Sequence, residues 1–92
     1  MELAETIKLM NSKDYKKRFV AEYWQTKIRY EKLKAFNTKI EANERKGNFT
    51  EPKHDCPNDL LLNQQRAMGE YLHILEVRAV IENVDLSETE AK

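Results

Sequence analysis

The chain has little of several features that mark common protein classes. It contains one cysteine in 92 residues, so no disulfide can form within it, and this fits a reducing compartment such as the cytoplasm. No apolar run approaches the roughly 20 residues that span a bilayer, and the first residues lack the pattern of a signal peptide. Only two glycines and two prolines interrupt the sequence, which permits long helices. We therefore expect a cytoplasmic all-α protein without a membrane segment.

Net charge is also lacking, because 16 basic residues balance 16 acidic ones. This balance argues against direct, non-specific DNA binding. It hides an asymmetry: residues 1–46 carry 12 basic and 7 acidic side chains, a net of +5, whereas residues 47–92 carry 4 and 9, a net of −5. Two antiparallel helices that attract each other would explain this asymmetry, and so would a basic groove that receives phosphate or carboxylate.

Catalytic and metal-site motifs are missing as well. The sequence has no Gly-rich phosphate loop, nucleophile elbow or acidic metal cluster. His54, Asp55 and Cys56, even with His73, make a poor match to the four-ligand pattern of structural zinc. We therefore expect a protein that is not an enzyme and has no cofactor and no metal.

Two stretches without helix breakers dominate the chain, separated by Gly47 and Pro57. A glycine after a helix can adopt the left-handed conformation that ends it, and a proline suits the start of the next one. A short connection makes the two helices antiparallel neighbours. The predicted units are a short N-terminal helix within 1–11, a hairpin over 12–86 with helices at about 13–45 and 57–83 and a loop at 46–56, and a flexible tail over 87–92.

Helical periodicity on the first long stretch gives two apolar stripes on nearly opposite sides. One is a seam for the second helix, in which we expect Asn37 to face Gln64 and Arg78 to face Tyr23. A lone hairpin buries too little surface to be stable, so we predict a homo-oligomer, with Trp24 on the second stripe as an interface anchor. The seam contains Tyr15, Phe19, Tyr23, Thr26, Tyr30, Leu33, Asn37 and Ile40, and the second stripe contains Val20, Trp24, Ile28 and Ala35.

Residues 13–36 concentrate 6 of the 8 aromatic residues and 8 of the 16 basic ones. Packing explains most of these rings, and a ligand with a ring and an anionic group would explain the interleaving equally. Arg78 has two interpretations, since it can face a ligand phosphate or form an ion pair with Glu22 or a neighbouring subunit. The candidate ligand-binding residues are Tyr23, Trp24 and Tyr30 for stacking and Arg18, Arg29, Arg66 and Arg78 for phosphate.

Several short motifs follow one another in a fixed order along the chain: residues 14–19, 21–24 and 28–33 before the loop, and 56–61, 64–68, 71–75 and 78–79 after it. This order resembles a family of small helical-hairpin proteins from phages and prophages of gut Firmicutes, related to a protein of crAss-like phages. The resemblance covers about residues 9–86 and implies a small phage protein acting in a bacterial cytoplasm. Phage proteins of this kind often inhibit host defence.

Three functions follow from this context. The first is an oligomeric sponge that sequesters a nucleotide immune signal, such as a cyclic nucleotide or an ADP-ribose-type molecule. Anti-CBASS and Thoeris anti-defence sponges, which are compact helical oligomers, offer an analogy at the level of fold and context. The second is an anti-CRISPR-like inhibitor that binds a host defence protein, and the third is a structural or accessory phage protein.

Overall fold

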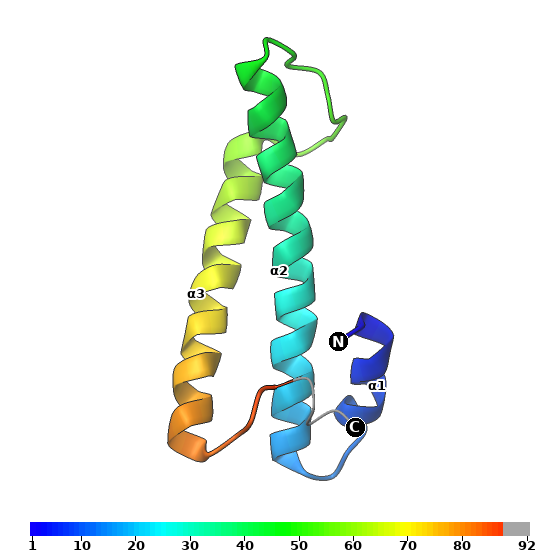
Figure 1. The fold of residues 1–92 in the computed structure, drawn as a ribbon, viewed down its shortest axis with the longest axis vertical. Coiled ribbons are helices and arrows are strands. Elements are labelled where there is room, and N and C mark those ends of the chain that lie inside the picture. The colour runs from blue at the N-terminus through cyan, green and yellow to red at the C-terminus, as the bar shows by residue number, and fades with distance from the viewer. Residues whose placement is uncertain (88–92) are drawn as a thin grey trace.

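The computed structural model describes residues 1–87 and contains only helices and loops over these residues (Figure 1). A 3-10 turn, η1 (Leu3–Glu5), leads into the short helix α1 (Thr6–Met10). The long helices α2 (Tyr15–Arg45) and α3 (Asn58–Glu82) form an antiparallel hairpin. The all-helical architecture with a short first helix is therefore confirmed, whereas the predicted flexible tail lies, apart from Ser87, outside the described residues.

Local side-chain and backbone bonds fix the ends of the long helices. Asp14 caps α2, because its Oδ1 accepts from the backbone N–H of Lys16 at 2.9 Å. Beyond the end of α2, Gly47 has a φ of 88°, a left-handed conformation that glycine adopts at little cost. Asn83 ends α3 in a similar conformation with a φ of 58°, and the N–H of Val84 reaches back to the Ala79 carbonyl at 2.8 Å.

The hairpin core follows the predicted seam. Phe19, Tyr23 and Ile40 of α2 are buried, as are Leu72, Leu75 and Ala79 of α3. Polar residues also lie in the seam, and Asn37 is only 7% exposed. Its side-chain amide donates to Gln65 Oε1 at 2.9 Å and to the Leu61 carbonyl at 3.2 Å. A hydrogen-bonded pair in the seam satisfies the rule that buried polar groups need partners.

The pairing predicted for two polar residues is wrong in detail. Gln64 is exposed, and its neighbour Gln65 is the residue that meets Asn37. Arg78 does not face Tyr23, because the Tyr23 hydroxyl bonds to Glu76 and the Arg78 guanidinium lies over the ring of Phe19. Successive helical residues differ by about 100° in direction, so a small error in the axial alignment of two helices exchanges neighbours.

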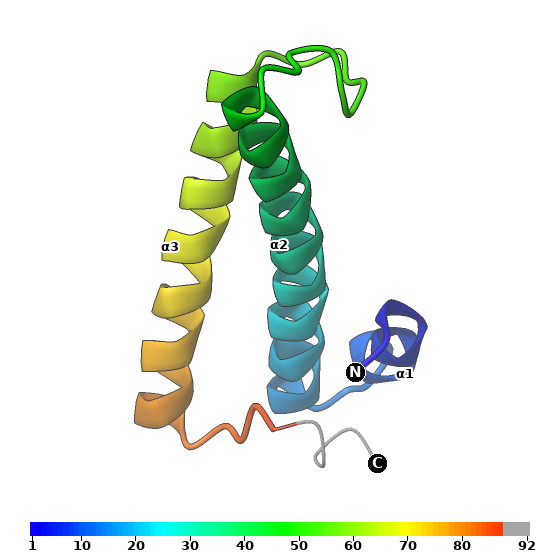
Figure 2. The ribbon, with the colours of Figure 1, turned by 45° about the horizontal axis from the view of Figure 1, so that its top comes forward.

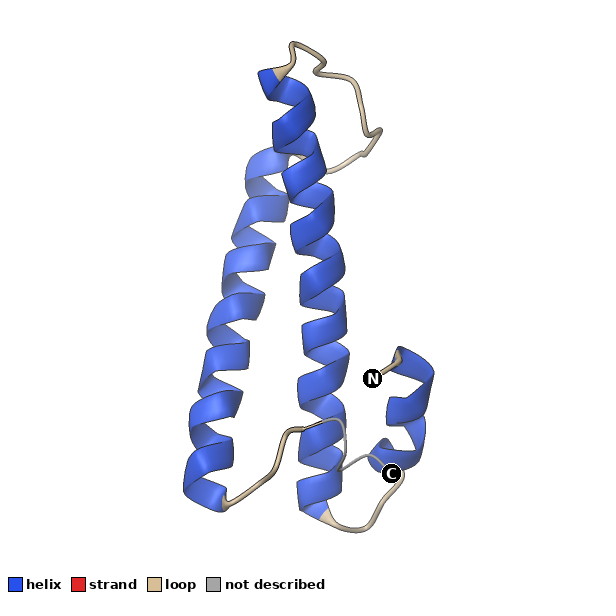
Figure 3. Cartoon of the chain, viewed as in Figure 1, coloured by secondary structure: helices blue, strands red, loops and turns tan. Residues whose placement is uncertain are grey.

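The open end of the hairpin has a third layer. Helix α1 packs beside α2, and the segment after α3 crosses from α3 towards α2 at the same end (Figure 2). At the opposite end a loop joins α2 to α3 (Figure 3). Leu9 of α1 and Val84 of the crossing segment join the core cluster with Val20, and Thr6 is fully buried. Gln25 of α2 donates to the Thr6 hydroxyl at 2.9 Å, which attaches α1 to α2.

This third layer corrects the expectation for Trp24. The indole packs against the core cluster, and its N–H donates to the Leu86 carbonyl at 2.9 Å. Trp24 therefore contacts its own chain instead of facing outward as an anchor for another subunit. The N-terminal part of the second apolar stripe, which includes Val20, is covered by α1 and the segment after α3.

Candidate functional site

The seven predicted ligand-binding residues fall into separate regions of the hairpin. Arg18 and Arg78 lie at the open end, and Tyr23 and Trp24 lie in the adjoining core. Tyr30 and Arg66 meet in a groove at mid-hairpin. Arg29 is exposed, and it points about 100° away from Tyr30 around the helix axis. Only the pair in the groove is brought together around an open space.

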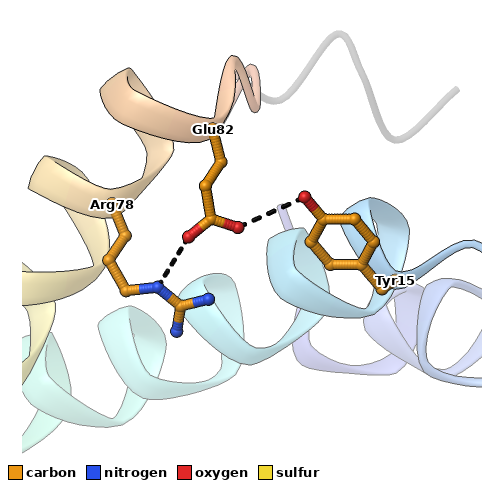
Figure 4. Close-up of polar contacts among 3 residues, drawn as sticks. All are labelled: Tyr15, Arg78 and Glu82. Carbon is orange, nitrogen blue, oxygen red and sulfur yellow. Dashed lines mark hydrogen bonds and ion pairs between the residues drawn. The ribbon is translucent and has the colours of Figure 1, made fainter.

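At the open end, Arg78 is engaged within the chain (Figure 4). Its Nε donates to Glu82 Oε2 at 2.8 Å, and the Tyr15 hydroxyl donates to Glu82 Oε1 at 3.2 Å. The guanidinium carbon lies 4.8 Å from the centroid of the Phe19 ring. Of the two alternatives for Arg78, the structure therefore shows an ion pair, but its partner is Glu82, one turn away, instead of Glu22.

The charges of this cluster stabilise one another. The hydrogen bond from Arg78 lowers the pKa of the Glu82 carboxyl, and the same bond raises the pKa of Arg78. Partial burial, followed by the hydrogen bond to Glu82, raises the pKa of Tyr15. Because the cluster is solvent-exposed, its ion pair contributes little to stability. Glu82 already neutralises Arg78, which makes Arg78 a weaker phosphate ligand than the sequence suggests.

The polar groups of Tyr23 and Trp24 both form hydrogen bonds within the chain. The Tyr23 hydroxyl donates to Glu76 Oε2 at 2.9 Å, and burial together with this bond raises the pKa of Tyr23 to about 12. The two rings meet edge to face, with centroids 5.6 Å apart and planes at 87°. Such T-shaped packing is a usual feature of aromatic cores. Both rings therefore pack the core, which is the explanation that the sequence analysis gave for most of the rings in residues 13–36.

Arg18 also has a structural contact. Its Nη1 donates to the backbone carbonyl of Ser12 at 2.8 Å, across the turn that joins α1 to α2. The bond adds a link between this turn and the first turn of α2. Arg18 is distant in sequence and in the fold from the groove at Tyr30, since the two side chains are more than three helical turns apart.

The groove at mid-hairpin is a concave surface lined by two of the predicted residues, Tyr30 and Arg66. It has a volume of about 740 Å³, within the range of small-molecule sites. Tyr30 is the one lining residue from α2, and the others are on α3: Leu62, Gln65, Arg66, Gly69, Glu70, His73 and Ile74.

Gly69 explains why α3 and the Tyr30 ring come so close. A Cβ atom at this position would lie 3.2 Å from Tyr30 Cε1 and 3.6 Å from its hydroxyl oxygen. Glycine in a helix interior is about 1 kcal/mol less favourable than alanine, so the sequence carries a local cost here. The Tyr30 ring occupies the space that a side chain at this position would take, and part of the ring lines the groove. A single glycine inside a helical pattern was the signal that could have located this groove from the sequence.

One positively charged side chain, Arg66, lines the groove with this ring, and two lysines flank the ring along α2. Arg66 uses Nη1 to donate to Asn63 at 3.2 Å, and its guanidinium has four further N–H donors. Lys27 and Lys34 lie three residues before and four residues after Tyr30, so they follow the same side of α2. Glu70 is the acidic residue of the groove lining. The arrangement can hold a molecule with a planar ring and an anionic group.

Other candidate chemistries have no support in the described part of the chain. Residues 1–87 contain no group of three or more His, Cys, Asp or Glu side chains placed to hold a metal ion. Cys56 is exposed at the start of α3. Among the described helices, none has the length and apolar character needed to cross a membrane.

Comparison with known proteins identifies the family. No curated protein and no solved structure matches the chain. A family model described as Sequestin matches residues 13–81, which is about three quarters of the chain and includes α2, the loop and nearly all of α3. The match contains every residue of the groove. The chain therefore belongs to the Sequestin family.

Proposed function

We propose that this protein is a phage anti-defence protein that sequesters a small nucleotide signal in the groove between Tyr30 and α3, in the cytoplasm of the bacterial host. The observation that carries the proposal is the half-buried Tyr30 ring, which packs over Gly69 and lines the same groove as Arg66. The family name fits a sequestering function and suggests binding instead of catalysis. The nucleotide nature of the ligand rests on the chemistry of the groove.

Each part of a nucleotide has a suitable group in the groove. The part of the Tyr30 ring that lines the groove offers a surface on which a flat base can stack, and base–aromatic stacking contributes about 1–3 kcal/mol. Guanidinium matches phosphate with two parallel hydrogen bonds, so Arg66 is the principal phosphate ligand. His73 and Gln65 add polar groups along the same wall of α3. Lys34 adds positive charge on the α2 side, whereas Lys27 is paired with Glu31 at 3.9 Å.

The test is isothermal titration of the purified chain against cyclic dinucleotides, cyclic trinucleotides and cyclic ADP-ribose isomers. At least one should bind, and it should be recovered unchanged after release from the protein. Absence of binding across the panel would reject the nucleotide ligand. Chemical conversion of a bound nucleotide would reject sequestration in favour of catalysis.

A matched pair of variants locates the site. Arg66→Gln removes the phosphate ligand of the groove, and we expect a 10- to 100-fold weaker affinity, since hydrogen bonds to charged groups contribute roughly 1.5–3 kcal/mol. Arg45→Gln is the control, because Arg45 is 79% exposed at the loop end of α2 and pairs only locally with Glu41. Its affinity should stay within about twofold of wild type. Equal effects of the two substitutions would place the ligand outside the groove.

The second candidate, an inhibitor that binds a host defence protein, is favoured by a different observation. Helix α3 exposes Ile74, Val80 and Ile81, with 54, 79 and 73% of each residue accessible, and Ile74 and Ile81 share one side of the helix. Large exposed apolar patches commonly mark protein–protein contacts. A stoichiometric bacterial protein retained in a pull-down, together with no heat from any nucleotide, would favour this function over sequestration.

A further inference from the structure

The loop between α2 and α3 is attached to the hairpin by a chain of hydrogen bonds that centres on His54. Its Nδ1 lies 2.7 Å from the Pro52 carbonyl oxygen, and its Nε2 lies 2.5 Å from Oδ1 of Asn58, the first residue of α3. The Asn58 amide nitrogen in turn donates to Glu44 Oε2 of α2 at 2.9 Å. These bonds connect the loop, the start of α3 and the C-terminal end of α2.

Both ring nitrogens of His54 must carry a proton for these two contacts to be hydrogen bonds. A carbonyl oxygen and an amide oxygen only accept, and a neutral imidazole has one N–H donor, whereas the imidazolium has two. If the Asn58 amide turned its nitrogen towards His54, its oxygen would face the Glu44 carboxylate, which only accepts. The geometry therefore fits the positively charged imidazolium, and a neutral ring can keep only one of the two bonds.

The surroundings of His54 favour the same protonation state. The hydrogen bond to the Pro52 carbonyl, followed by the one to Asn58, raises the pKa of His54 above its ordinary value of 6.5. Desolvation acts in the opposite direction and is smaller than either bond. The nearby carboxylates, Asp55 of the loop and Glu44 of α2, raise the pKa further, and α3 contributes only the uncharged Asn58. The charge of His54 therefore changes near neutral pH.

The other contacts that attach the loop to α2 do not depend on a group that titrates near neutral pH. Asn43 Nδ2 donates to the Glu51 carbonyl at 2.8 Å, and the Phe36 ring meets the imidazole edge to face, with centroids 5.7 Å apart. The side chains of Glu51 and Lys53 line the same pocket as His54 and carry opposite charges. Histidine is the side chain whose charge ordinarily changes between pH 5 and 8, so His54 is the contact that pH can break.

We propose that His54 is a pH-sensitive latch, which holds the loop against Asn58 when the imidazole is charged and releases it when the imidazole loses a proton. The neutral ring keeps its bond to Pro52, because that bond lies within the loop and moves with it. Since folding raises the pKa of His54, the stabilisation by the latch is fully present below pH 6.5 and is lost as pH rises through the pKa of the folded protein. The loop supplies most of the wall of a pocket of about 340 Å³ that reaches the buried Ile40, so its release opens this end of the seam to water.

Proton NMR of the full chain between pH 5 and pH 9 tests the protonation state of the latch. The imidazole signals of the two histidines are assigned with His54→Gln, which removes one of them. We expect the pKa of His54 to lie above 6.5 in wild type and to fall in Asn58→Ala, which lacks the acceptor on α3. Asn63→Ala is the matched control, because Asn63 is exposed on the same helix and bonds to Arg66. It should leave the pKa of His54 unchanged. A wild-type pKa of 6.5 or lower, or the same pKa in wild type and Asn58→Ala, would overturn the proposal.

Release of the loop is measured separately in the wild-type chain. The edge-to-face contact of Phe36 with His54 should give a nuclear Overhauser effect between the two rings at pH 5.5, and this signal should weaken severalfold at pH 8.5. The signal between Tyr23 and Trp24, whose centroids are 5.6 Å apart in the core, is the internal control and should be the same at both pH values. An equally strong signal between Phe36 and His54 at the two pH values would show that the loop stays in place, and it would reject the latch even if Asn58→Ala did not fold.

Discussion

Removal of the Tyr23 hydroxyl should change the stability of the protein in a way that depends on pH. Tyr23 is 6% exposed and donates to Glu76 at 2.9 Å. At neutral pH, Tyr23→Phe leaves the ring packed and frees an exposed carboxylate that water can solvate. The expected loss of unfolding free energy is about 1 kcal/mol, a typical net value for one hydrogen bond.

The effect of pH follows from the raised pKa of Tyr23. Burial and the bond to Glu76 move this pKa from 10.0 to about 12, so folding favours the protonated phenol. The contribution to stability is fully present below pH 10 and is lost as pH rises through about 12. Two pKa units correspond to about 2.7 kcal/mol in total, of which about half, near 1.4 kcal/mol, is lost between pH 8 and pH 11.

Urea unfolding followed by circular dichroism at pH 8 and pH 11 measures this term. Other groups also titrate in this range, so the relevant quantity is the difference between wild type and Tyr23→Phe at each pH. That difference should shrink by about 1.4 kcal/mol at pH 11, and the variant should equal or exceed wild type there. Tyr71→Phe, which removes an exposed phenol, is the control. A difference that is the same at both pH values would refute the reasoning.

Three further substitutions test other parts of the hairpin by the same unfolding assay. Leu75→Ala, at a residue 1% exposed in the seam, should cost about 2–5 kcal/mol, and a loss below 1 kcal/mol would contradict the assigned core. Arg78→Gln should leave the urea midpoint nearly unchanged, because its ion pair with Glu82 is exposed, and a large shift of the midpoint would contradict this assignment. Gly69→Ala should change stability by less than about 1 kcal/mol, since better helix propensity offsets displacement of Tyr30, but should weaken nucleotide binding in titration.

The architecture could be predicted from the sequence because helical periodicity and helix breakers are local signals. The seam through Phe19, Tyr23 and Ile40 emerged from spacing alone, since residues three and four apart share one side of a helix. The exchange of Gln64 for Gln65 marks the limit of this reasoning. Both glutamines flank the same seam, and only the axial position of the two helices decides between them.

The placement of Trp24 depended on contacts that periodicity does not encode. A stripe pattern shows that a side of α2 is apolar, but it does not show which segment covers that side. In the structure a short helix folds back through Thr6 and Gln25, and the chain after Asn83 crosses to accept the indole N–H. Such short segments have too few turns for a recognisable amphipathic pattern, so their docking sites could not be found from sequence.

The position of the groove follows from the uneven thickness of the protein. At the open end, α1 and the crossing segment enclose α2, so the rings of Tyr23 and Trp24 are used in packing. At mid-hairpin α2 meets only α3 on the groove side, and a ring there stays partly accessible, as Tyr30 does. Which rings of residues 13–36 are buried is therefore decided by the segments that pack against them, because the composition of the stretch is similar along its length. The rings near the open end stabilise the hairpin, and Tyr30 lines the groove in which we propose that the ligand binds.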